Sequence, residues 1–333
     1  MGNKKVLAGI GLLLVAVAMA WYSNRVEQGD VRLDDQVDAG LRQKISRLDQ
    51  ELFAAIRADR QEEIAGQISP QLQLMLDGAD HPFRPFRTIM DHGEPVGLHV
   101  YDYTGPTRQL ASGTNKTWTM LLPPVGFERF IISLYTLPLK NKQGIAVQDY
   151  LIGIIRGGKG WPIITMNTGV FRLLGADHDD WMGRAMQEYT GDPLMQSLSL
   201  TLAGQLRRPF EWFAFQESDA HTELRERFAD LVSKAEGEYQ AGAGQTARVF
   251  KVAPFILGGS SRVFPEISWV TQIPVDQRDA IDAGAAALRR SLEERSPLFR
   301  NYSGSLVFKA FNELPSDEGG SYPVRRSLVR SAH

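Results

Sequence analysis

The chain has 333 residues, of which 43% are hydrophobic and 23% are charged, so it is long enough for about two domains with separate cores. Its formal net charge of -2 does not suggest nucleic-acid binding, which would need a concentrated basic patch. The absence of cysteine excludes disulfides, thiolate metal sites and cysteine nucleophiles, but it does not decide the compartment.

The first segment, residues 1–25, predicts export. Two lysines precede an apolar run, Val6–Tyr22, and acidic residues follow it, which favours an N-terminus inside the cytoplasm and the rest of the chain outside. A small-x-small sequence ending at Ala20 has the form of a signal peptidase site. We therefore expect either a signal peptide cleaved after Ala20, giving a periplasmic or secreted protein, or an uncleaved inner-membrane anchor.

Residues 26–35 are polar and predict a spacer. From Gln36 to Ala58, apolar residues recur every three or four positions and predict an amphipathic helix. Shorter helices are expected over Gln61–Ile68 and from Ser69-Pro70, where serine suits the cap and proline the first turn.

Strands follow these helices. The expected strands are Val96–Tyr103, Thr117–Leu122, Phe127–Thr136 and a hairpin within Asp149–Gly175. Helices followed by an antiparallel run predict an α+β domain over residues 36–175.

The turn of that hairpin superficially resembles a phosphate-binding loop. Residues 153–159 match the first seven positions, but Gly160 stands where the loop needs serine or threonine. Trp161-Pro162 then begins a strand and not a helix whose amide groups would bind phosphate. A glycine hairpin turn is therefore the prediction.

The pattern changes after Gly175, and residues 176–313 predict a second α+β domain. Helices are expected first, then a β-hairpin around residues 258–261, a helix after Asp276 and a last strand over Gly304–Phe311. A crossover connection would return that last strand to the sheet of the hairpin. Residues 314–333 are rich in proline, serine, glycine and arginine and predict a flexible tail.

Ring side chains on one predicted strand are the candidate catalytic residues. His99, Tyr101 and Tyr103 fall on one face of Val96–Tyr103, and Trp118 is a candidate ligand-binding residue beside them. The alternative is that these rings form ordinary core between sheet and helix, with their polar tips satisfied at its edge.

Metal-capable side chains cluster once, at Asp177, His178 and Asp180. They stand where a helix begins, so the aspartates are also suited to accept amide hydrogen bonds there. The sequence leaves a cation site and simple helix capping as alternatives, and it carries no motif for a cofactor. A third feature, the aromatic run Phe210–Phe215 with Trp212, is either core or a contact for a partner or a membrane surface.

Residues 36–175 resemble the nuclear transport factor two-like (cystatin-like) superfamily. The shared features are an amphipathic helix, a short helix containing Ile68-Ser69-Pro70-Gln71-Leu72, and strands that end in a hairpin with Gly160-Trp161-Pro162-Ile163-Ile164. The resemblance implies a cone-like curved sheet with a pocket, and it fixes no function because the superfamily includes isomerases, dehydratases and non-catalytic envelope proteins.

Two functions follow as hypotheses. The first is an exported, membrane-anchored or periplasmic binding or assembly module without catalysis, with a protein partner in the cell envelope and no nucleic acid. The alternative is an isomerase- or hydrolase-like enzyme in the cone of the N-terminal domain, with His99 as acid or base and Tyr101 or Tyr103 orienting the substrate.

Overall fold

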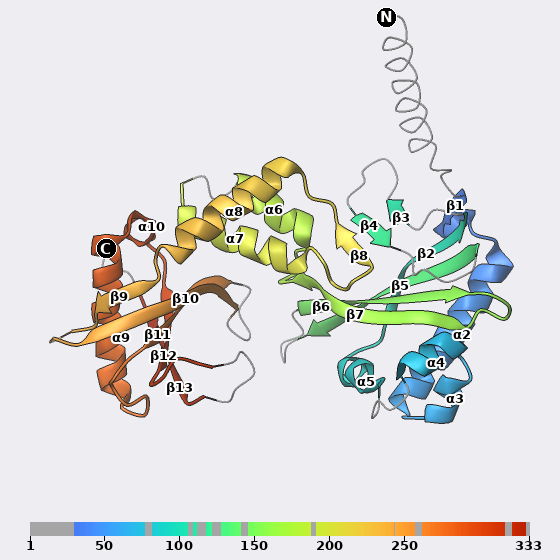
Figure 1. Ribbon diagram of the computed structural model, residues 1–333, viewed down its shortest axis with the longest axis horizontal. Helices are drawn as coiled ribbons and strands as arrows, with labels where there is room; N and C mark the ends of the chain where they lie inside the picture. The colour runs from blue at the N-terminus through green and yellow to red at the C-terminus, as the bar shows by residue number, and fades with distance from the viewer. Residues whose placement is uncertain are drawn as a thin grey trace, which may run out of the picture. The chain divides into compact units, whose positions relative to one another are not determined.

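The computed structural model describes residues 30–76, 82–105, 109–111, 118–121, 128–140, 146–187, 191–242, 244–256, 262–316 and 322–330. Helices combine with antiparallel and mixed sheets, which confirms the α+β class (Figure 1). The described residues divide into two units, the first drawn from 30–113, 119–137 and 151–168, and the second from 118, 138–150 and 169–330. The predicted export segment Val6–Tyr22 lies outside the described residues.

The first half of the chain contains one long helix, several short ones and the strands of a five-stranded sheet. Their bounds are β1 Asp30–Leu33, the 3-10 helix η1 Asp34–Gln36, α2 Ala39–Arg57, α3 Gln61–Ala65, α4 Pro70–Leu76, α5 Arg84–Met90, β2 Val96–Thr104, β3 Gln109–Ala111, β4 Trp118–Leu121, β5 Arg129–Lys140, β6 Ala146–Gly157 and β7 Ile163–Leu173.

The strand order of this sheet is β1-β2-β5-β6-β7, and β2 pairs antiparallel with both of its neighbours. The first strand corrects the sequence prediction, because residues 30–33 belong to the expected spacer yet pair with Tyr101–Thr104. A β-bulge between Gly97 and His99 breaks the register of β2 with β5, and bulges of this kind increase the local bend and twist of a strand.

Helix α2 forms where the apolar periodicity predicts a helix. Asp38 caps it, because its carboxylate accepts a hydrogen bond from the amide of Leu41 at 2.8 Å. The buried side of the helix carries Ile45, Leu52 and Ile56, and Phe53 meets the ring of Tyr135 edge to face at 5.0 Å. Helix and sheet therefore share one apolar core in this unit.

The glycine hairpin is confirmed. Strand β6 ends at Gly157 and β7 begins at Ile163, with no helix between them. Gly158 and Gly160 have φ angles of +78° and +86°, which glycine adopts without steric cost. Arg129 lies over the Trp161 ring at 5.5 Å and adds a cation–π contact to the turn.

The second half of the chain begins with helices and ends with a mixed sheet. The bounds are α6 His178–Gln187, α7 Pro193–Leu206, β8 Phe213–Phe215, α8 Asp219–Ser233, β9 Gly237–Gln240, β10 Thr246–Ile256, β11 Val263–Val270, α9 Arg278–Arg295, α10 Pro297–Arg300, β12 Leu306–Phe311 and β13 Val324–Val329.

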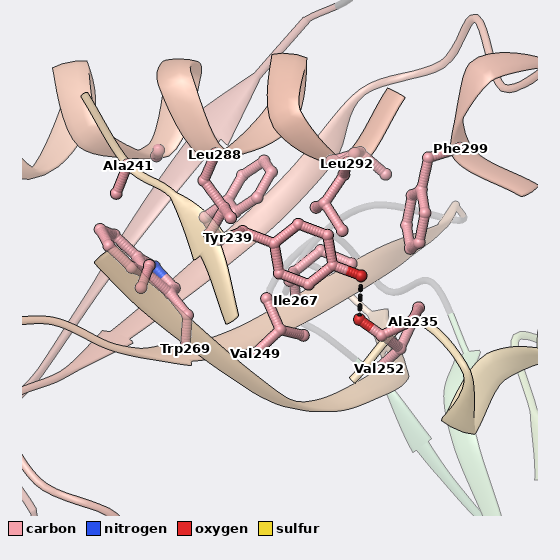
Figure 2. Close-up of a cluster of buried hydrophobic side chains, with 14 of the residues drawn as sticks. Ala235, Tyr239, Ala241, Val249, Val252, Ile267, Trp269, Leu288, Leu292 and Phe299 are labelled. Atoms are coloured by element: carbon pink, nitrogen blue, oxygen red, sulfur yellow. Dashed lines mark hydrogen bonds between the residues drawn. The ribbon is translucent and has the colours of Figure 1, made fainter. Parts of the chain in front are cut away.

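Strands β9 to β13 form one sheet in the order β13-β12-β11-β10-β9. The expected crossover is present, because β12 runs parallel to β11 and α9 lies between them in the sequence. Figure 2 shows the core on this side of the sheet, where Leu288 and Leu292 of α9 pack over Ile267 and Trp269. Tyr239 lies within this core and donates its hydroxyl hydrogen to the Ala235 carbonyl at 2.7 Å.

The predicted flexible tail is wrong for residues 324–329, which form the outer strand β13. The strand pairs antiparallel with β12 from Val324↔Phe311 to Val329↔Leu306. The guanidinium of Arg289, on α9, donates a hydrogen bond to the Val329 carbonyl at 2.8 Å. Pairing with β12 and contacts with α9 thus order a segment whose composition alone is typical of a loop.

The boundary between the two units differs from the one predicted at residue 175. It falls within β7, at residues 168 and 169, because Val170, Leu173 and Leu174 pack against the core formed by α6, α7 and α8. Residues 138–150, which the prediction gave to the first domain, also belong to the second unit.

Gly169 is required by a close backbone approach. A Cβ atom at this position would stand 1.7 Å from the carbonyl oxygen of Pro209. We expect Gly169→Ala to lower the free energy of unfolding by about 2–3 kcal/mol, because the backbone must shift to relieve the overlap. Chemical denaturation followed by circular dichroism measures the change.

Gly183→Ala is the matched control. Gly183 lies inside α6, and beyond its own stretch of helix no described atom stands within 4 Å of its would-be Cβ. Alanine there is expected to raise stability by about 0.5–1 kcal/mol through helix propensity. Equal effects of the two substitutions would contradict the close approach at Pro209.

Candidate functional site

The predicted ring face exists on β2. The ring of His99 lies 5.9 Å from that of Tyr101, and Tyr103 stacks on Phe130 at 6.4 Å. Tyr101 and Tyr103 are buried, whereas His99 is part-exposed. Of the three candidate catalytic residues, only His99 therefore presents its side chain to solvent.

An aspartate that sequence reasoning missed completes a pair with this histidine. Asp34, in η1, has a positive φ of +48°, and its Oδ2 lies 2.8 Å from Nδ1 of His99. Its Oδ1 accepts the amide hydrogen of Val100 at 2.8 Å. Because a carboxylate only accepts, Nδ1 carries the proton, and Nε2 of the neutral ring is left with a lone pair.

The Tyr101 phenol, unlike the His99 ring, offers a proton and no lone pair for a base. Burial, and then the negative charge of Asp34, raise the pKa of the Tyr101 phenol above its ordinary value. The phenol therefore stays protonated through the physiological range and can donate a hydrogen bond, but it does not supply a base.

The core between α2 and the sheet contains a buried ion pair. Nε of Arg156, on β6, donates to Oδ1 of Asp49 at 2.8 Å, and Nη2 lies 2.7 Å from the same oxygen. The Tyr135 hydroxyl donates to Oδ2 of Asp49 at 2.7 Å, and Nη1 of Arg156 donates to the carbonyl of Trp161 at 3.0 Å. Burial, followed by the charge and hydrogen bond of Asp49, raises the pKa of Tyr135.

This Asp49–Arg156–Tyr135 network joins the helix to the sheet through hydrogen bonds and an ion pair, although the buried Nη2 of Arg156 has no hydrogen-bond partner in the described part of the chain. The sequence carried a signal for it. Asp49 interrupts the buried stripe of α2 between Ile45 and Leu52, and Arg156 is the one charge among the buried residues Leu151–Arg156 of β6. The sequence therefore shows one charge on each of two apolar surfaces. It does not show that the two charges pair, because they are 107 residues apart.

Trp118, the candidate ligand-binding residue, belongs to an aromatic cluster. Its ring stacks on Phe213 at 5.7 Å, and Phe213 meets Phe210 and Phe215 at 5.7 Å each. Phe210, Trp212, Phe213 and Phe215 are all buried. The partner or membrane contact considered for this run is therefore wrong, and the run is core.

The three metal candidates lie at the start of α6 in a capping arrangement. The amide of Asp177 donates to Oδ2 of Asp180, and the amide of Asp180 donates to Oδ1 of Asp177, both at 3.1 Å. Nδ1 of buried His178 lies 2.8 Å from the carbonyl oxygen of Ala203, and its ring stacks on Phe215 at 5.2 Å. The described residues contain no group of three histidines or acids that could hold a metal ion.

The second ring nitrogen of His178, Nε2, is buried. Nε2 lies 3.9 Å from Oδ1 of Asp179 and has no hydrogen-bond partner within the described part of the chain. Burial, joined by the charges of Asp177 and Asp180, raises the pKa of Asp179, although His178 and His221 oppose the rise.

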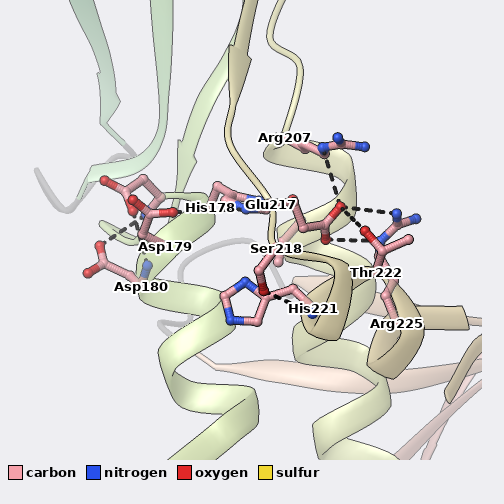
Figure 3. Close-up of polar contacts among 11 residues, drawn as sticks. His178, Asp179, Asp180, Arg207, Glu217, Ser218, His221, Thr222 and Arg225 are labelled. Carbon is pink, nitrogen blue, oxygen red and sulfur yellow. Dashed lines mark hydrogen bonds and ion pairs between the residues drawn. The ribbon is translucent and has the colours of Figure 1, made fainter. Parts of the chain in front are cut away.

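A buried carboxylate lies close to this helix start in Figure 3. Glu217 accepts hydrogen bonds from Nε and Nη2 of Arg225, each at 3.2 Å, and Nε of Arg207 lies 3.3 Å away. Burial opposes ionisation, but the hydrogen bonds and charge of Arg225, with Arg207, outweigh it and hold the pKa of Glu217 below its ordinary value. The two arginines fix the loop before α8 to the end of α7.

Glu217→Gln is expected to lower stability at neutral pH by about 1–2 kcal/mol, because it removes a charge that two arginines share. A lowered folded-state pKa contributes stability above the unfolded pKa and loses it as the pH falls through the folded pKa. The difference between wild type and variant should therefore shrink below about pH 4. Urea unfolding across pH 3–7 measures it, and a pH-independent difference would contradict the ion-pair account.

In comparisons with known proteins, no family model, curated protein or solved structure matches the chain. Among the described residues, no helix is both long and apolar enough to cross a membrane.

Proposed function

We propose that this chain is an exported binding or assembly module of the cell envelope without catalytic activity. Val6–Tyr22 either tethers it to the inner membrane or is removed by cleavage after Ala20. The cone-like architecture that the superfamily resemblance implies for residues 36–175 is part of the proposal. Support comes from the core of the first unit. Tyr101 and Tyr103 are buried there, and the buried charges of Asp49 and Arg156 pair with each other.

The location is tested with single cysteines, because the natural chain has none. A membrane-impermeant maleimide is applied to intact cells that carry either Glu223→Cys, at an exposed position of α8, or Asn3→Cys, before the apolar run. We expect labelling of the first variant without lysis. The second should be labelled only after lysis if the segment is an anchor, and should be lost from the mature protein if it is cleaved. Labelling of Glu223→Cys only after lysis would overturn the proposal.

A second candidate is an isomerase- or hydrolase-like enzyme, and the Asp34–His99 hydrogen bond favours it. In that function Asp34 would orient the ring and Nε2 of His99 would accept a proton from the substrate. Its prediction is that His99→Gln and Asp34→Asn each lower turnover by about 10²-fold or more.

The assay uses the full chain in detergent micelles with aryl esters and an enolisable ketone as probes. Under the binding proposal, any turnover is the same in wild type and in both variants. A loss shared by His99→Gln and Asp34→Asn, but absent from the exposed control Met75→Gln, would replace the first function by the second.

A further inference from the structure

Within the part of the chain that the structure describes, the outer edge of the second sheet is open. Strand β13 ends the strand order and, among the described residues, pairs only with β12. One side of its backbone therefore lacks a partner strand, and such an edge is a template on which another extended chain can add.

A groove accompanies this edge. Its volume is about 480 Å³, and it lies between β13 and one stripe of α9 formed by Arg278, Asp282 and Ala286. The small side chain of Ala286 leaves space beside the strand. The Ser327 hydroxyl bonds to Asp282, and Arg289 holds the Val329 carbonyl, so the strand is fixed in place before any partner arrives.

The groove has a surplus of positive charge. Arg278, Arg325 and Arg330 line it, and Asp282 is the only acid among its described lining residues. Arg278 already pairs with that acid, because its Nε lies 3.8 Å from Oδ2 of Asp282. Within the described part of the chain, the side chains of Arg325 and Arg330 form no hydrogen bond or ion pair, and Arg325 pairs with β12 through its backbone alone. Arg326 is already committed, because its Nε donates to Glu266 at 2.7 Å and its guanidinium lies 5.1 Å from the Phe255 ring centre.

One face of β13 carries Val324, Arg326 and Leu328, and the other carries Arg325 with Ser327. Val324 and Leu328 are 37% and 53% exposed, and they stand on the face of the strand opposite to Ser327. An added strand would therefore meet apolar surface on that face and the charge of Arg325 on the face of Ser327. The groove lining has no aromatic ring on which the bases of a nucleic acid would stack.

We propose that the β13 edge binds an extended acidic polypeptide segment, which adds to the sheet as a sixth strand and places its carboxylates against Arg325 and Arg330. This inference rests on the proposed binding function and names the surface and the class of partner. Backbone hydrogen bonds along β13 supply the alignment, and the arginines select for acidic side chains.

The probe is a fluorescein-labelled peptide of alternating glutamate and valine, about eight residues long to match a strand. Fluorescence anisotropy measures its binding to the full chain in detergent micelles. We expect saturable binding, about tenfold or more weaker binding when alternate amides of the peptide are N-methylated, and no binding when lysine replaces glutamate. N-methylation keeps the charge and removes the pairing hydrogens, so it needs no change in the protein.

The protein variant Arg325→Glu with Arg330→Glu should weaken binding by about tenfold or more, with a steep salt dependence of the wild-type affinity. Arg227→Glu, at an exposed position of α8, makes the same kind of charge reversal away from β13 and should change affinity by less than about twofold.

Three results would overturn the inference: no binding of the acidic peptide, equal binding of its N-methylated form, or equal binding of an oligothymidylate of similar charge. In the first case the arginines serve only to protect the edge from aggregation. These outcomes are separate from the cysteine-labelling result, so an exported chain that fails to bind the peptide loses this surface and keeps its location.

Discussion

Arg156→Met is expected to lower the free energy of unfolding by about 3–5 kcal/mol, because it leaves the carboxylate of Asp49 buried without its counter-charge. Arg156 and Asp49 are both almost completely buried, so water cannot replace the lost partner. The Trp161 carbonyl also loses its hydrogen bond from Nη1. Urea unfolding followed by circular dichroism gives the difference.

The matched control removes the whole network. Asp49→Leu with Tyr135→Phe and Arg156→Met replaces all three polar groups by apolar ones of similar size, and we expect it to recover most of the lost stability. If the triple variant were as unstable as Arg156→Met alone, the loss would stem from packing and not from an unpaired charge.

Trp269→Ala is expected to cost about 3–5 kcal/mol in the second unit, through the cavity that removal of a buried ring leaves. Trp269 is fully buried beneath α9, and its ring occupies the space that Gly284 provides, where an added Cβ would stand 3.2 Å from the indole. Since the site is fitted this closely, the surrounding helix and strands have little room to collapse. Thermal and urea unfolding both measure the loss.

Trp269→Phe separates volume from hydrogen bonding. The indole nitrogen has no hydrogen-bond partner in the described part of the chain, so the change to phenylalanine removes side-chain volume but no hydrogen bond. We expect it to lower the free energy of unfolding by about 1–2 kcal/mol. A cost equal to that of alanine would show that the indole nitrogen makes an essential contact.

Local signals in the sequence were sufficient for much of the fold. The apolar periodicity of 36–58 predicted α2, and the glycines at 157–160 predicted the tight turn after β6. The helix after Asp276 and the parallel return of β12 also followed from pattern and connection rules. In each case one short window contains the residues that determine the element.

The sequence failed where distant partners decide the structure. Strand β1 was read as spacer and β13 as tail, because both are short, lie in polar stretches and become strands only through pairing with β2 and β12. The Asp34–His99 contact spans 65 residues and the Asp49–Arg156 contact 107, so no local pattern reveals either. The capping alternative at Asp177 and Asp180, by contrast, depends on neighbours in sequence and was foreseen.

The candidate site was likewise predicted in part. The shared face of His99, Tyr101 and Tyr103 follows from strand alternation, but their unequal burial depends on tertiary neighbours such as Phe130, which stacks on Tyr103. The groove beside β13 was not predicted, since it requires that strand and α9 together.

A photo-crosslinking measurement in intact cells tests the central claim, that this chain binds a polypeptide partner and does so outside the ring face of β2. A benzoylphenylalanine residue replaces Leu328, His99 or, as an exposed control, Met75. We predict a crosslinked polypeptide from position 328 that disappears in the Arg325→Glu, Arg330→Glu background, and none from the other two positions. Crosslinks from position 99 but not from position 328 would contradict the account.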